Sequence, residues 1–216
     1  MHLKRLPILA ILTASGLVAP SATAAQSPRA ATYITDEEVK VVNATPGIDR
    51  TIKVVDIGNE NFAVGIIHRG ASGGGGAAAR GAGAATPAPV AAAEACGQQA
   101  TGATTGGTPG ISHDSQTEGY LIVSGRGTLV TGGVIVNGRK SAPDGAVTKE
   151  LNGPSCSGTI VGPDVVKRQV KTGDIIIIPA GVAHGWSDIT DHVDYLSFRP
   201  SARVLQAGYV HPAIRR

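Results

Sequence analysis

The segment GDIIIIPAGVAHGWSD, residues 173–188, carries the clearest structural signal in the chain. Its four consecutive β-branched isoleucines predict a strand that is buried on both faces. Pro179 and Gly181 then favour a sharp turn, because proline fixes φ and glycine tolerates turn conformations. We therefore expect His184 to begin the returning strand, with its imidazole directed into the interior of a β-structure.

A second segment, ISHDSQTEGYLIVSG at residues 111–125, supplies two more side chains that can bind a metal ion. Residues 111 and 113 share one face of an extended strand, since successive side chains alternate. The polar stretch 114–117 predicts a reversal, after which Glu118 faces back toward His113. With His184 arriving from a third strand, two imidazoles and one carboxylate can converge. Such a set suits a divalent transition metal with coordination positions left open.

The two segments resemble the two conserved motifs of the cupin superfamily. The later motif, G-x5-P-x-G-x2-H-x3-N, has Asp188 where the family usually has Asn and is otherwise matched at Gly173, Pro179, Gly181 and His184. The earlier motif, H-x-H-x4-E-x6-G, has Ile111 in place of its first histidine and is matched at His113, Glu118 and Gly125. The resemblance covers most of the chain outside one insertion.

Membership of this family implies a double-stranded β-helix, the jelly-roll barrel of cupins, which are often homodimers. It implies that His113, Glu118 and His184 hold Fe(II), Mn(II), Ni(II) or Zn(II). Cupins include dioxygenases, isomerases, lyases, storage proteins and sugar-binding sensors, so the fold does not settle the function. A metal-dependent enzyme acting on a small oxygen-rich molecule, a non-catalytic small-ligand-binding protein and a purely structural barrel are three open hypotheses.

Short Val/Ile-rich runs bounded by Gly, Pro, Asn and Asp occur along the rest of the chain and predict an all-β barrel or sandwich. The expected strands are 51–56, 62–68, 119–124, 127–130, 133–136, 174–178 and 193–198. The best helical candidate, 36–42, is short, so we expect at most a turn or a frayed helix. Residues 71–110 are almost entirely Gly, Ala, Thr and Pro. They predict a flexible loop inserted into a single domain, residues 25–216.

Residues 1–24 are typical of a secretory signal, because Lys4 and Arg5 precede an apolar run that closes with an A-x-A site at residues 22–24. We therefore expect an exported protein, periplasmic or extracellular, without a membrane span after signal removal. Loss of the two cations lowers the formal net charge from +3 to +1, which disfavours nucleic acid as a partner. In an oxidising compartment, Cys96 and Cys156 favour a disulfide.

Four further residues are candidates for the pocket. Tyr120 shares a face with Glu118 by the period of two, so its phenol is expected to line the site and to assist proton transfer, or to pack. His68 could replace the missing ligand if its strand runs beside His113, or it is a strand-end histidine. Trp186 is expected to wall the pocket. Arg199 would bind a substrate carboxylate if its face is internal, and is otherwise a surface residue.

The sequence favours neither a phosphate loop nor the nucleophile elbow of α/β-hydrolases. The glycines at 73–76 are not followed by the Lys-Ser/Thr ending of a phosphate loop, and no Gly-x-Ser-x-Gly elbow occurs.

Overall fold

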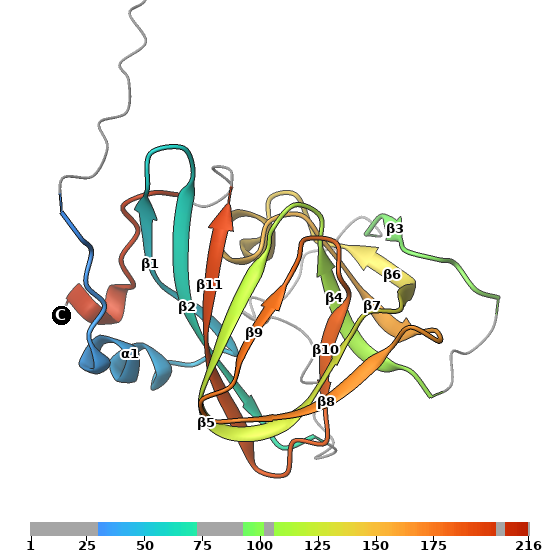
Figure 1. Cartoon of the computed structure of the whole chain (residues 1–216). Helices are drawn as coiled ribbons and strands as arrows, with labels where there is room; N and C mark the ends of the chain where they lie inside the picture. Colours follow the sequence, from blue (N-terminus) through green and yellow to red (C-terminus); the bar gives the residue numbers. More distant parts are fainter. Residues whose placement is uncertain (1–29, 73–92, 102–105, 202–205, 216) are drawn as a thin grey trace, which may run out of the picture.

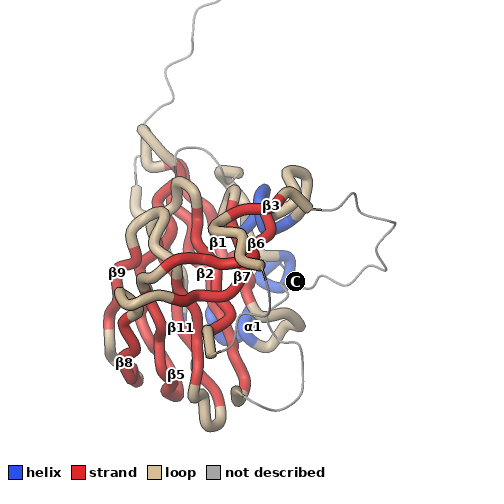
Figure 2. Tube along the Cα trace, turned by 90° about the vertical axis from the view of Figure 1, so that its right-hand side faces the viewer, coloured by secondary structure: helices blue, strands red, loops and turns tan. Residues whose placement is uncertain are grey.

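Antiparallel β-structure makes up most of the protein. The computed structural model describes residues 30–72, 93–101, 106–201 and 206–215, so the expected signal at 1–24 lies outside the described residues, as does most of the expected insertion. Figure 2 shows strands throughout the body of the molecule, with only short helical segments among them. No described helix has the length and apolar character needed to cross a membrane. The all-β prediction is confirmed.

Two sheets share one long strand, β5 (Glu118–Thr131). The first sheet has the order β1 (Asp49–Asp56), β2 (Asn61–Gly70), β11 (His192–Ser201), the first half of β5, and β9 (Ile175–Ile178). In the second sheet, β8 (Val166–Lys171) and β10 (His184–Ser187) flank the other half of β5. The order continues from β10 through β4 (Thr108–His113), β7 (Ser155–Val161), β6 (Val134–Lys140) and β3 (Ala95–Cys96). Figure 1 shows the two sheets enclosing a barrel interior.

Gly125 lets β5 pass from one sheet to the other as a single strand, where the sequence predicted two. Its φ is +71°, and a Cβ at this position would lie 2.0 Å from the carbonyl oxygen of His192. Only glycine combines the left-handed conformation with this close approach.

The helix α1 (Asp36–Asn43) is better formed than predicted. Thr35 and Glu38 make a reciprocal capping box at its start, which satisfies two of the backbone N–H groups that begin a helix without partners. Val42 packs against Ile52 and Ile66 on the outer side of the first sheet. The 3₁₀ helix η2 (Pro212–Arg215) lies beside α1 near the C-terminus (Figure 1), and a π-helix, η1 (Val147–Leu151), precedes β7.

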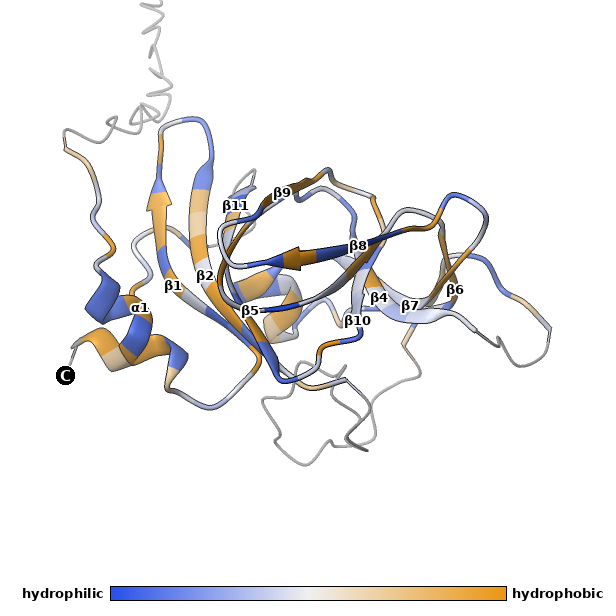
Figure 3. Ribbon diagram, turned by 60° about the horizontal axis from the view of Figure 1, so that its bottom comes forward, coloured by the Kyte–Doolittle hydropathy of each residue, from blue (hydrophilic) through white to orange (hydrophobic). Residues whose placement is uncertain are grey.

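The prediction that the four isoleucines of β9 form a strand buried on both faces is wrong. Ile178 is buried in the barrel, but Ile175 and Ile177 are 71% and 65% exposed. The run therefore forms the edge of the first sheet with one buried face, and Figure 3 shows it hydrophobic along its length. A row of β-branched residues indicates a strand but not whether a second layer covers it.

The range 71–110, predicted to be a flexible loop, contains regular structure at its end. Both β3 and the first residues of β4 fall within it. The predicted disulfide between Cys96 and Cys156 is present and joins β3 to β7, with a Cα–Cα distance of 5.9 Å.

Candidate metal centre

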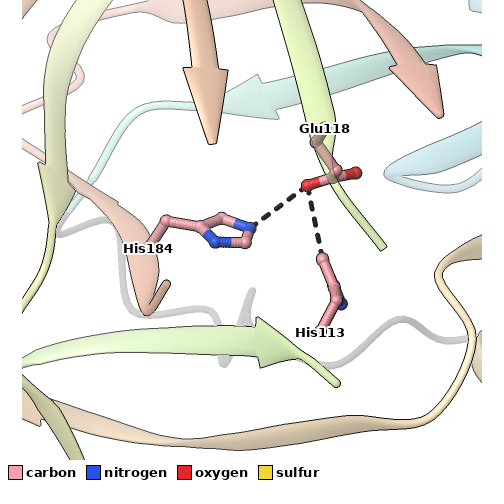
Figure 4. Close-up of side chains that lie close together, drawn as sticks. All are labelled: His113, Glu118 and His184. Atoms are coloured by element: carbon pink, nitrogen blue, oxygen red, sulfur yellow. Dashed lines mark hydrogen bonds and ion pairs between the residues drawn. The ribbon is translucent and has the colours of Figure 1, made fainter. Parts of the chain in front are cut away.

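Three strands bring the candidate ligands together. His113 ends β4, Glu118 begins β5 and His184 begins β10. The backbone N–H of Gly181 donates to the carbonyl oxygen of His113, so the turn before His184 is fastened to the strand that carries His113. Figure 4 shows both imidazoles directed at one oxygen of Glu118.

The cluster is compact and buried. His113 Nε2 lies 3.3 Å and His184 Nε2 3.2 Å from Glu118 Oε2. One potential ligand atom from each residue lies within 4.8 Å of the others. The three residues are only 2–4% exposed, so water screens their charges weakly.

Hydrogen bonds on the far side of each imidazole fix its tautomer. His184 Nδ1 lies 3.0 Å from the carbonyl oxygen of Val182, which can only accept, so Nδ1 carries the proton. Ser155 Oγ donates its hydrogen to the carbonyl oxygen of Gly153 and must therefore accept from His113 Nδ1. In the neutral form of each ring, Nε2 then presents a lone pair to the carboxylate.

Two imidazole lone pairs and a carboxylate oxygen cannot hydrogen-bond to one another. The arrangement requires protons on Nε2 or a cation between these atoms. Neutral imidazoles anchored through Nδ1, together with a carboxylate, are the usual donor set of a transition-metal site. The residues present thus fit a divalent ion.

The other oxygen of Glu118 is held away from this centre. Arg199 Nε donates to Glu118 Oε1 at 3.0 Å and Ser197 Oγ donates to it at 3.2 Å. Arg199 also pairs with Asp49 on β1. Because this network contains two carboxylates and one guanidinium, it retains one negative charge that favours a bound cation.

The pKa values follow from these contacts. Burial alone would raise the pKa of Glu118. With protons on Nε2 of His113 and His184 in place of a cation, hydrogen bonds from these rings and the charge of Arg199 outweigh burial, and the pKa lies well below its ordinary value. Burial and the neighbouring Glu118 carboxylate raise the pKa of Tyr120 well above its usual value. The phenol is therefore a neutral donor, and its OH lies 2.7 Å from Glu118 Oε2.

Aromatic rings fill the barrel beside the cluster. The Tyr120 and Tyr195 ring centroids are 4.4 Å apart, and those of Tyr195 and Trp186 are 5.2 Å apart. Tyr120 lies against the site as expected. Trp186 is one layer removed and packs in the adjoining core.

The structure decides between the alternatives considered for His68 and for Arg199. Strand β2 pairs with β1 and β11 rather than β4, so His68 does not join the cluster and instead bonds Asp194 at 2.6 Å. Arg199 is 1% exposed and therefore not a surface residue. Its guanidinium donates to the carboxylates of Glu118 and Asp49, so these donors are occupied by protein groups rather than by a substrate.

Several partners escaped sequence reasoning. Ser155, Ser197 and Asp49 orient the ligands from strands distant in sequence. Polar Tyr195, Ser197 and Arg199 alternate with apolar Leu196 and Phe198, and this pattern predicts two faces without telling which one is internal.

Comparisons with known proteins give only distant structural similarity. No family model and no characterised protein sequence matches the chain. A solved protein with a double-stranded β-helix domain from Klebsiella pneumoniae subsp. pneumoniae is 12% identical, with a TM-score of 0.38 over 81% of this chain and 93% of that one. A Bacillus halodurans protein is also 12% identical, with a TM-score of 0.39 over 87% and 93%.

An oxalate oxidase in complex with glycolate is 14% identical, with a TM-score of 0.31 over 74% of this chain and 54% of that protein. At such identities and scores, these similarities do not bear on the activity of the chain.

Proposed function

We propose that the chain is an exported cupin that binds one divalent metal ion through His113, Glu118 and His184. The observation that carries the proposal is the pair of Nδ1-anchored imidazoles whose Nε2 atoms face one carboxylate oxygen. Fe, Mn, Ni and Zn all accept this donor set.

The proposed activity is that of a metal-dependent enzyme on a small oxygen-rich organic substrate, of the dioxygenase, isomerase or lyase type. A bound ion would supply Lewis acidity or O₂ activation at its open positions. Arg199 and Ser197 hold Glu118 so that Oε2 alone faces the centre, and the Tyr120 hydroxyl, whose oxygen lies 2.7 Å from Oε2, donates its proton to that oxygen. The packed rings of Tyr195 and Trp186 lie beyond Tyr120 on one side of the cluster.

A second candidate is a structural or non-catalytic metal site, which the near-complete burial of the ligands favours. In that case the ion joins β4, β5 and β10 and stabilises the barrel. Metal removal would then lower the melting temperature, while the reconstituted protein would turn over no organic acid or sugar.

Export and dimerisation belong to the proposal. The apolar segment after Lys4 and Arg5 supports export, as does the Cys96–Cys156 disulfide, since such bonds persist in oxidising compartments. The exposed side chains of Ile175 and Ile177 on an edge strand support a homodimer, because exposed apolar edges tend to pair. Sedimentation of the purified protein measures this directly.

Elemental analysis of the protein, purified from the compartment to which it is exported, tests metal binding. We expect about one transition-metal ion per chain and its loss in His184→Ala. The matched control is His68→Ala, which removes an imidazole outside the cluster and should retain the metal. Absence of metal, together with a melting temperature that chelation does not change, would refute the metal site.

A further inference from the structure

A second group of polar side chains lies at the far end of the first sheet. Ser124 Oγ is 2.8 Å from His192 Nε2, and His192 Nδ1 is 2.7 Å from Asp191 Oδ2. The group joins β5 to the start of β11 and shares no residue with the metal centre. We call Ser124, His192 and Asp191 the serine trio.

The proton positions in the serine trio follow from its partners. A carboxylate only accepts, so His192 Nδ1 carries the hydrogen that bonds Asp191. In the neutral ring, Nε2 then holds a lone pair and accepts the hydrogen of Ser124. Catalytic serine triads have the same arrangement, in which a serine hydroxyl bonds Nε2 of a histidine and a carboxylate bonds its Nδ1. Such triads are defined by this geometry and not by the order of the residues in the sequence.

The backbone sets this geometry through two local irregularities. Asp194 pairs with Ser124 and Tyr195 pairs with Ile122, so Val123 is an extra residue that bulges β5 immediately before Ser124. A bulge re-aims the following side chain, and bulges are frequent beside active sites. Gly125 follows, and its missing Cβ allows His192 to approach β5.

The serine trio is accessible. The His192 side chain is 31% exposed and that of Asp191 is 88% exposed. A cavity of about 390 Å³ is lined by Thr190, which precedes Asp191, and by Arg126, two residues after Ser124, although no member of the trio itself lines it.

We propose that Ser124 is a nucleophile activated by His192, able to accept an acyl group from a small ester. Ser124 Oγ forms a bond to the ester carbonyl carbon while its proton passes to His192 Nε2. The carbon–alkoxy bond breaks, and the leaving oxygen takes that proton and departs as an alcohol. Water then attacks the acyl-serine by the same route, releasing the acid and restoring the hydroxyl.

The three residues should contribute unequally. His192 takes the proton directly, and general-base help is worth about 10²- to 10⁴-fold. Asp191 only orients the ring, and water screens its exposed carboxylate. His192→Gln should therefore slow acylation much more than Asp191→Asn.

The test is labelling of the full chain with a fluorophosphonate, followed by peptide mass spectrometry, with p-nitrophenyl acetate as the acyl probe. We expect labelling at Ser124, its loss in Ser124→Ala, and a rate at least about 100-fold lower in His192→Gln. The matched control is His68→Gln, because His68 bonds Asp194, and its ring centroid lies 6.1 Å from that of His192. This variant should label at the parental rate.

Two results would overturn the proposal. One is labelling of Ser124 no faster than that of other exposed serines, and the other is a rate that His192→Gln leaves unchanged. Circular dichroism and bound metal content of each variant separate loss of folding from loss of the nucleophile, since the serine trio is distinct from the metal ligands.

Discussion

Arg199 Nε donates a 3.0 Å hydrogen bond to Glu118 Oε1, which leaves Oε2 as the only oxygen of that carboxylate facing the two imidazoles. The guanidinium thereby orients a proposed metal ligand from a strand that carries none itself. Asp49 holds the far side of Arg199.

Replacing Arg199 by Leu should destabilise the protein by about 3–5 kcal/mol, because it removes the guanidinium that neutralises the buried Glu118 carboxylate and the partly buried Asp49. Ser197→Ala should cost only about 1 kcal/mol, since Arg199 still bonds Glu118 Oε1. Urea unfolding of the metal-free proteins measures both values. A loss below about 1 kcal/mol for Arg199→Leu would contradict the assigned role.

Ser155→Ala should weaken Zn(II) binding by about 10- to 100-fold, because the hydroxyl that holds His113 Nδ1 is lost while all three ligands remain. Calorimetric titration of metal-free protein provides the dissociation constants. Ser157→Ala is the matched control, since Ser157 lies exposed on the same strand. Equal affinities of the two variants would argue against Ser155 as an orienting partner.

The proposed metal ligands could be predicted because each depends on local pattern. Strand alternation, a polar turn and a Pro-x-Gly turn determine where His113, Glu118 and His184 point, and those features lie within two short segments. The start of α1 also depends on a local pattern, Thr35 followed by Glu38 three residues later, and this capping box stabilises a helix that its shortness alone does not predict.

Burial of a whole strand face could not be predicted in the same way. Arg199 is internal because of how β11 pairs with β5 and β2, which is a tertiary property. Ile175 and Ile177 are exposed because no described element covers that face of β9. The serine trio likewise depends on a bulge in β5 and on strand pairing that brings together Ser124 and His192, which are 68 residues apart in the sequence.

Stability should fall on acidification partly through Glu118. Its pKa in the folded state lies below the ordinary value of 4.5, so its stabilising contribution is fully present above that pH. The contribution is lost as the pH falls through the folded-state pKa. Unfolding of the metal-free protein between about pH 6 and pH 3 should show a shallower pH dependence in Glu118→Gln than in the parent.

The exposed residue Glu37 provides the control for this comparison, because Glu37→Gln removes a carboxylate that lies on the surface. The parental pH dependence should persist in that variant. Parallel curves for Glu118→Gln and the parent would show that Glu118 does not couple folding to pH.

Gly125→Ala should destabilise the barrel much more than Gly173→Ala, although both glycines have positive φ values, +71° and +93°. The left-handed conformation costs an alanine about 1–2 kcal/mol at either position. At Gly173 nothing lies within 4 Å of the added Cβ, whereas at Gly125 the carbonyl oxygen of His192 lies at 2.0 Å. β5 and β11 must therefore separate in Gly125→Ala, which disturbs their pairing where β5 changes sheets. Thermal unfolding of the two variants measures the difference, and equal melting temperatures would show that backbone conformation alone explains the glycine at 125.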